Sequence, residues 1–200
     1  MNIPTSLTLL RIALIPVFVL AFYVPFGWGN ALSAAIFGIA AATDWLDGFL
    51  ARRLGLTSQF GAFLDPVADK LMVAVALVLL VQGDPSPWVA IPAAVIIGRE
   101  IAISALREWM AKIGHGQRVA VVMLAKVKTT CQLTSIILML YRDPIGAVPS
   151  YQLGLALLYV AAVLTIWSMV GYLKAALPVL DDRPRPEEAP PPPAPGVDGP

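Results

Sequence analysis

Cysteine, histidine and charged side chains are scarce in this chain of 200 residues. Cysteine occurs once, as Cys131, and histidine once, as His115, which excludes an internal disulfide and argues against a zinc centre. Charged residues make up only 14% of the chain, and the net charge of +1 excludes a nucleic-acid binder that relies on bulk positive charge. Hydrophobic residues reach 58%, above the usual share of a soluble domain. The composition therefore predicts an integral membrane protein that binds no nucleic acid.

Long uncharged runs divide the chain into six expected helices. Residues 12–43 carry no charge and exceed the ~20 residues that one helix needs to cross a bilayer. Pro25, Gly27 and Gly29 mark a turn within this run. Because the runs lack the alternation of barrel strands, we expect an all-α integral membrane protein with six transmembrane helices. The expected spans are 9–26, 31–53, 61–81, 88–110, 118–141 and a sixth that begins near residue 151.

Basic residues gather at one set of the expected helix ends, and Arg142 is the basic residue of the opposite set. The positive-inside rule then predicts that both termini lie in the cytoplasm. Nine prolines fall within the last 23 residues. We expect a six-helix membrane domain over residues 1–177 and a disordered, proline-rich cytoplasmic tail over residues 178–200.

Four carboxylates lie toward the cytoplasmic ends of the second and third expected helices. They are Asp44, Asp47, Asp65 and Asp69. On helices of 100° per residue, the first pair shares an arc with Arg52, and the second pair lies one turn apart on one face. Carboxylates in a membrane are costly and repel one another, so a compensating partner is expected, and a hard divalent cation is a candidate. Gly48 and Gly61 leave room for a large ligand nearby.

Structural ion pairs or the proton path of a transporter are alternative reasons for acidic groups in a membrane. A transporter predicts polar residues that continue to the outer face. The outer halves of the same two helices, residues 31–37 and 75–81, are almost entirely apolar. The pattern therefore favours a ligand site over a transport path.

The two aspartate segments have the pattern D-x-x-D-G-x-x-A-R, a spacer, and G-x-x-x-D-x-x-x-D. The eight fixed positions are Asp44, Asp47, Gly48, Ala51, Arg52, Gly61, Asp65 and Asp69. This pattern resembles the signature of the CDP-alcohol phosphotransferase family. The resemblance implies that family's fold of six membrane helices, a homodimer in the bacterial cytoplasmic membrane, and an active site open to the cytoplasm.

The resemblance also implies roles for these positions. Two Mg²⁺ ions, with Mn²⁺ as a substitute, would be held by Asp44, Asp47, Asp65 and Asp69. Asp69 would in addition act as the general base. CDP-diacylglycerol would contact Asp44, Gly48, Arg52 and Gly61, with Arg52 at the diphosphate and the glycines beside the cytidine.

Three further stretches, residues 2–11, 99–110 and 126–130, are similar to the branch of this family whose acceptor is glycerol 3-phosphate. The implied reaction transfers the phosphatidyl group from CDP-diacylglycerol to sn-glycerol 3-phosphate and releases CMP. The acceptor phosphate would be bound by Arg107, Lys126, Lys128 and Arg99, although Arg99 could instead pair with Glu100. We interpret Arg11 as an ordinary positive-inside charge. The eight-position pattern alone leaves serine, inositol phosphate and phosphatidylglycerol open as acceptors.

Overall fold

The protein folds into six helices in the computed structural model, which describes residues 3–54, 59–112 and 122–180. Within these ranges, the side chains of residues 3–5, 45, 47–54, 59–60, 62, 122–126, 175–176 and 178–180 are outside the description. The helices are α1 (Ile3–Phe22), α2 (Gly29–Leu54), α3 (Gln59–Gly83), α4 (Pro87–Lys112), α5 (Val122–Tyr141) and α6 (Ser150–Leu180). The all-α prediction with six helices is confirmed.

The first and last helices differ from the expected bounds. α1 ends at Phe22 rather than near residue 26, because Pro25 and Gly27 form a turn whose last bond runs from the Gly29 N–H to the Phe26 carbonyl, 2.8 Å away. α6 continues to Leu180, three residues past the expected boundary of the membrane domain. The tail from residue 181 onward lies outside the described residues.

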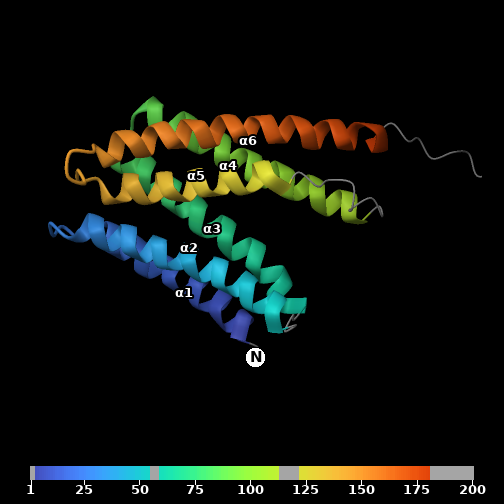
Figure 1. Cartoon of the computed structure of the whole chain (residues 1–200), viewed down its shortest axis with the longest axis horizontal. Coiled ribbons are helices and arrows are strands. Elements are labelled where there is room, and N and C mark those ends of the chain that lie inside the picture. The colour runs from blue at the N-terminus through green and yellow to red at the C-terminus, as the bar shows by residue number, and fades with distance from the viewer. Residues whose placement is uncertain (1–2, 55–58, 113–121, 181–200) are drawn as a thin grey trace, which may run out of the picture.

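The helices run up and down, so that their ends collect at two opposite ends of the bundle (Figure 1). The start of α1 lies at the same end as the last turns of α2, α4 and α6. α1 packs on α2 and α3, and α6 packs on α5 and α4. These two groups of three meet through α2 against α5 and through α3 against α4. The second and third helices thus present their charged ends at the same end of the molecule as the charged end of α4.

One close contact fixes the α5–α6 pair. A Cβ added to Gly154 would lie 2.7 Å from Met139 and 3.0 Å from the Ser135 carbonyl oxygen. The Ser135 hydroxyl also donates a hydrogen bond of 2.7 Å to the Gly154 carbonyl. A side chain at this position would force the two helices apart, so the absence of one sets their spacing.

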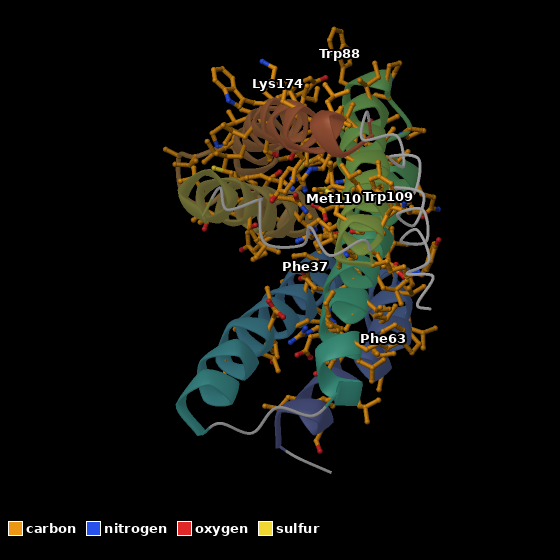
Figure 2. The ribbon with its side chains drawn as sticks, turned by 90° about the vertical axis from the view of Figure 1, so that its right-hand side faces the viewer. Phe37, Phe63, Trp88, Trp109, Met110 and Lys174 are labelled. Atoms are coloured by element: carbon orange, nitrogen blue, oxygen red, sulfur yellow. The ribbon has the colours of Figure 1, made fainter. Side chains whose placement is uncertain are left out.

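Large apolar side chains occur both inside and outside the bundle. Phe37, Leu77 and Ile136 are fully buried, whereas Trp88 and Trp167 are about 70% exposed. Figure 2 shows Trp88 pointing away from the helices, while Phe37 lies on α2 where it faces the group formed by α4, α5 and α6. In the described part, α4 and residues 150–174 of α6 are long and apolar enough to cross a membrane. Such outward apolar surface suits lipid contact.

Candidate active site

Three of the four predicted carboxylates belong to one region of the bundle. Asp44 lies on α2, and Asp65 and Asp69 lie one turn apart on α3. Asp69 interacts electrostatically with the negative charges of Asp44 and Glu100 and with the positive charges of Arg11 and Lys70. The structure therefore brings Asp44 and Asp69 within electrostatic range of each other, as two facing helices require.

Part of the predicted site falls outside the described side chains. Asp47, Gly48 and Arg52 belong to α2 by the bounds of that helix, and Lys126 belongs to α5, but their side chains are not described. Gly61 is buried near the beginning of α3.

α1 supplies a partner to each of two carboxylates. Arg11 forms an ion pair with Asp44, in which Nη1 lies 2.7 Å from Oδ1. The side chain of Arg11 is only 2% exposed, whereas that of Asp44 is 44% exposed. One turn earlier, the hydroxyl of the fully buried Thr8 donates a hydrogen bond to Oδ1 of Asp65. α1 therefore contacts the carboxylates of both α2 and α3.

Neither role follows from the sequence pattern. The prediction of Arg11 as an ordinary positive-inside charge is wrong, because its side chain is buried on an acidic partner. The available signal was an arginine directly before a long apolar run, because an ionisable residue inside a membrane helix usually has a partner. Thr8 carried no comparable signal, since a single hydroxyl in an apolar helix commonly bonds within its own helix.

The floor of the carboxylate region is tightly packed. A cavity of only about 10 Å³ lies between Arg11 and Asp69, and its other lining side chains are apolar. Its apolar lining comes from Phe37, Ala40, Ala41, Met72, Val73 and Leu133. This lining continues into the apolar core, which includes Ala76, Leu77 and Leu80 farther along α3. The charged site therefore ends within the bundle on this side.

The donor set fits a hard divalent cation in chemical type. Asp44, Asp65 and Asp69 offer carboxylate oxygens, the donors that Mg²⁺ and Mn²⁺ prefer. Among the described side chains, no three acidic, histidine or cysteine groups converge on one metal position. One oxygen of Asp44 accepts from Arg11, and one of Asp65 accepts from Thr8. Each carboxylate thus keeps its second oxygen as a possible ligand.

A second charged cluster joins α4, α5 and α6. Glu100 accepts hydrogen bonds from Nζ of Lys128 at 2.6 Å and from Nη1 of Arg99 at 2.7 Å. Arg99 also donates from Nη2 to the Ser168 hydroxyl on α6, 2.9 Å away. Arg107 is exposed near the end of α4, and its charge acts on Lys128. Three of the four cations expected at the acceptor phosphate thus belong to one neighbourhood.

An apolar hollow of about 310 Å³ lies between α3 and α4. Val67, Leu71, Ile97 and Ile101 contribute to its wall, and Lys70 and Glu100 are its charged members. The hollow therefore adjoins both charged clusters, since Lys70 and Glu100 also act on Asp69.

Comparison with known proteins accounts for this arrangement. A family model described as CDP-alcohol phosphatidyltransferase matches residues 1–167. The chain belongs to the CDP-alcohol phosphatidyltransferase family, which implies a membrane protein and confirms the resemblance noted in the sequence.

Three relatives share the name CDP-diacylglycerol–glycerol-3-phosphate 3-phosphatidyltransferase. The protein of Pectobacterium atrosepticum is 61% identical over 175 residues, covering 88% of this chain and 94% of the relative. The protein of Sodalis glossinidius is 58% identical over 177 residues, covering 88% and 95%. The protein of Salmonella typhimurium is 57% identical over 175 residues, covering 88% and 94%.

Proposed function

We propose that the protein transfers the phosphatidyl group from CDP-diacylglycerol to sn-glycerol 3-phosphate, giving phosphatidylglycerophosphate and CMP. The observation that carries this proposal is the identity of 57–61% to relatives named for this reaction, extending over 88% of the chain. The two charged clusters support it, because one is rich in carboxylates and the other in cations.

The reaction requires the chain to bind two substrates and to accept one proton from the acceptor hydroxyl. The acceptor hydroxyl oxygen forms a bond to the phosphorus that bears the diacylglycerol. The bond from that phosphorus to the bridging oxygen breaks, and CMP leaves with that oxygen. We assign Asp69 as the base that takes the hydroxyl proton. Asp69 lines a small cavity with apolar neighbours, and a carboxylate is a weak base, so the placement of the acceptor hydroxyl next to it must supply much of its effect.

We assign Asp44, Asp47, Asp65 and Asp69 as the residues that would hold two Mg²⁺ ions, or Mn²⁺ in their place. Ions bound there would neutralise the negative charge of the diphosphate. Arg52 would face the diphosphate, and Gly48 and Gly61 would leave space for the cytidine. Arg11 and Thr8 orient two of these carboxylates from α1.

For the acceptor, we propose that Arg107, Lys126, Lys128 and Arg99 surround the phosphate of glycerol 3-phosphate. Fixed cationic donors are what a phosphate needs. A serine acceptor carries no phosphate and would leave this cluster without a ligand. A transporter would need a polar path beyond Asp69, but apart from Arg11 and Asp69 themselves the side chains that line the small cavity there are apolar, and the apolar core continues along α3.

The proposal extends to the arrangement in the membrane. All six helices would cross the bacterial cytoplasmic membrane, with both termini and the active site on the cytoplasmic side and two copies forming a homodimer. Residues 1–177 would form the catalytic domain and residues 178–200 a proline-rich tail. A reporter protein that is active only in the cytoplasm should therefore be active when it is fused to either end of the chain.

The decisive experiment measures CMP release by the full chain, purified in detergent, with CDP-diacylglycerol and Mg²⁺. Glycerol 3-phosphate, serine, inositol phosphate and phosphatidylglycerol are compared as acceptors. We expect release with glycerol 3-phosphate alone, loss of activity on chelation with EDTA, and its return with Mg²⁺ or Mn²⁺. Release with another acceptor would overturn the substrate assignment, and activity that survives chelation would overturn the metal assignment.

Two matched variants test whether the Asp69 carboxylate is required. Asp69→Asn should lower the rate by about 10²–10⁴-fold, the usual contribution of a positioned base. Asp143→Asn makes the same change at an exposed position in the α5–α6 connection, at the opposite end of the bundle. This control should keep the rate of the unmodified protein. Equal rates for the two variants would contradict the role of Asp69.

A further inference from the structure

Glu100 lies at the centre of the cluster that joins α4 to α5 and α6. Its Oε1 atom accepts from Lys128 at 2.6 Å and from Arg99 at 2.7 Å. The two partners come from different helices, since Lys128 belongs to α5 and Arg99 directly precedes Glu100 on α4. A single carboxylate oxygen therefore fixes two of the cations assigned to the acceptor phosphate.

The cluster is buried and carries more positive than negative charge. The side chains of Lys128 and Arg99 are 6% and 11% exposed, and that of Glu100 is 23% exposed. Two cations on one carboxylate leave an excess of one positive charge. A buried charge is stable only with a partner of opposite sign. The excess charge suits an anionic ligand such as a phosphate monoester.

The position of Arg99 is also fixed from α6. Its Nη2 donates to Ser168 at 2.9 Å, and its guanidinium carbon lies 5.9 Å from the centre of the Tyr172 ring. Its Nε atom is buried and has no hydrogen-bond partner among the described residues. The guanidinium is thus contacted by Glu100 from α4 and by Ser168 and Tyr172 from α6, and its Nε–H is left without a partner among the described residues.

The cluster borders the proposed catalytic base. The charge of Glu100 acts on Asp69, and the charge of Arg107 acts on Lys128. Glu100 thus interacts electrostatically with the proposed base, and its partner Lys128 interacts with Arg107, so the cluster is close enough for one acceptor to reach both the base and the cations.

We infer that Glu100 is a positioning residue for the acceptor phosphate. It holds Lys128 and Arg99 side by side, where their like charges would otherwise drive them apart, so that both donate to one phosphate. This inference rests on the proposed function and adds a residue that neither the sequence pattern nor the aspartate site contains. A pair that served stability alone would leave acceptor binding unchanged when it is weakened.

The test compares two identical substitutions on α4 of the full chain. Glu100→Gln removes the charge that holds Lys128 and Arg99. Glu108→Gln removes the partner of Lys112 in an exposed pair of 3.1 Å one turn from the helix end. Glu100→Gln should raise the KM for glycerol 3-phosphate by about tenfold or more, because a hydrogen bond to a charged group is weakened. The KM for CDP-diacylglycerol should change by less than about twofold, and Glu108→Gln should change neither.

A double-mutant cycle with Lys128→Met shows whether Glu100 acts through its partner. Glu100→Gln is made both in the unmodified protein and in the Lys128→Met protein, and the factor by which it raises the acceptor KM is measured in each. If Glu100 acts through Lys128, the factor in the Lys128→Met protein should be smaller by about twofold or more. Equal factors in both backgrounds would overturn the inference. So would an unchanged acceptor KM, or a parallel change in both KM values together with the thermal midpoint.

Glu100→Asp provides the same test if Glu100→Gln does not fold, because it keeps the charge and shortens the reach. It should raise the acceptor KM with little effect on kcat, and an unchanged acceptor KM would again contradict the inference. Failure of the proposed function gives a different result, namely no CMP release by the unmodified protein with glycerol 3-phosphate.

Discussion

The hydrogen bond from Thr8 to Asp65 gives the sharpest test of the site. Thr8→Val replaces the hydroxyl with a methyl group of similar size, so that the packing of α1 changes little while Asp65 loses its donor. Thr8 is fully buried. A hydrogen bond to a charged group contributes about 1.5–3 kcal/mol, and water can replace part of it because Asp65 is half-buried. We therefore expect a loss of about 1–2 kcal/mol in the free energy of unfolding.

The effect on activity should exceed the effect on stability. An outer partner that orients a metal-ligating group is commonly worth about 10–100-fold in metal affinity or activity. Thr8→Val should accordingly lower CMP release by about this factor, with a larger requirement for Mg²⁺. Thr8→Ser keeps the hydroxyl and should recover most of the rate.

Thr165 offers a matched control. It is as fully buried as Thr8, but its hydroxyl has no hydrogen-bond partner among the described residues. Because a buried hydroxyl without a partner costs about 1–3 kcal/mol, Thr165→Val should leave stability unchanged or raise it by about 1 kcal/mol. Its activity should equal that of the unmodified protein.

Both measurements use protein in detergent. Tryptophan fluorescence follows thermal unfolding, and CMP release gives the rate. For a chain of this size, 1 kcal/mol corresponds to about 2–4 °C in Tm, so Thr8→Val should unfold about 2–8 °C lower. The reasoning is refuted if Thr8→Val retains the full rate, or if the two Thr→Val variants shift Tm and rate equally.

Two further predictions concern the partners of other carboxylates. Arg11→Met should lower CMP release by about 10–100-fold because Asp44 loses its ion-pair partner, and Arg11→Lys should recover part of the rate; equal rates for these variants would show that the charge has no role. At the opposite end of the bundle, the Tyr151 hydroxyl donates to Asp84 at 2.5 Å and holds the pKa of Asp84 below its usual value. The stability from this bond is present above the unfolded pKa and is lost as the pH falls through the folded one. Tyr151→Phe should therefore cost about 0.5 kcal/mol at neutral pH, near the low end for a solvent-open hydrogen bond, and nothing in strong acid. Parallel Tm curves over this pH range would contradict that assignment.

Much of the fold follows from charge-free runs and turn residues. Membrane helices are long and continuous, so their number can be predicted from where apolar runs stop. The end of α1 was placed too late, because Pro25 and Gly27 start the turn after Phe22 rather than at the end of the apolar run. Helical periodicity also predicted that Asp65 and Asp69 share a face.

The partners of the carboxylates depend on information that periodicity lacks. Thr8 reaches Asp65 across 57 positions, and Arg11 reaches Asp44 across 33. These contacts exist because α1 packs on both α2 and α3, and a single sequence does not specify which helices are neighbours. The pairing of Arg99 with Glu100 could be considered from the sequence, because the two residues are adjacent. The hydrogen bond from Lys128 to Glu100 could not, because it depends on how α5 packs against α4.

The grouping of the helices has a consequence for how such enzymes diverge. Asp69, and Asp44 and Asp65 with their partners on α1, belong to the first three helices, whereas Arg99, Glu100 and Lys128 belong to the last three. With the roles proposed above, substitutions in α4–α6 would exchange the alcohol without altering the residues that hold the nucleotide. The residues proposed for the nucleotide and those proposed for the acceptor alcohol would then lie in different groups of helices, so that selection could act on one group without the other.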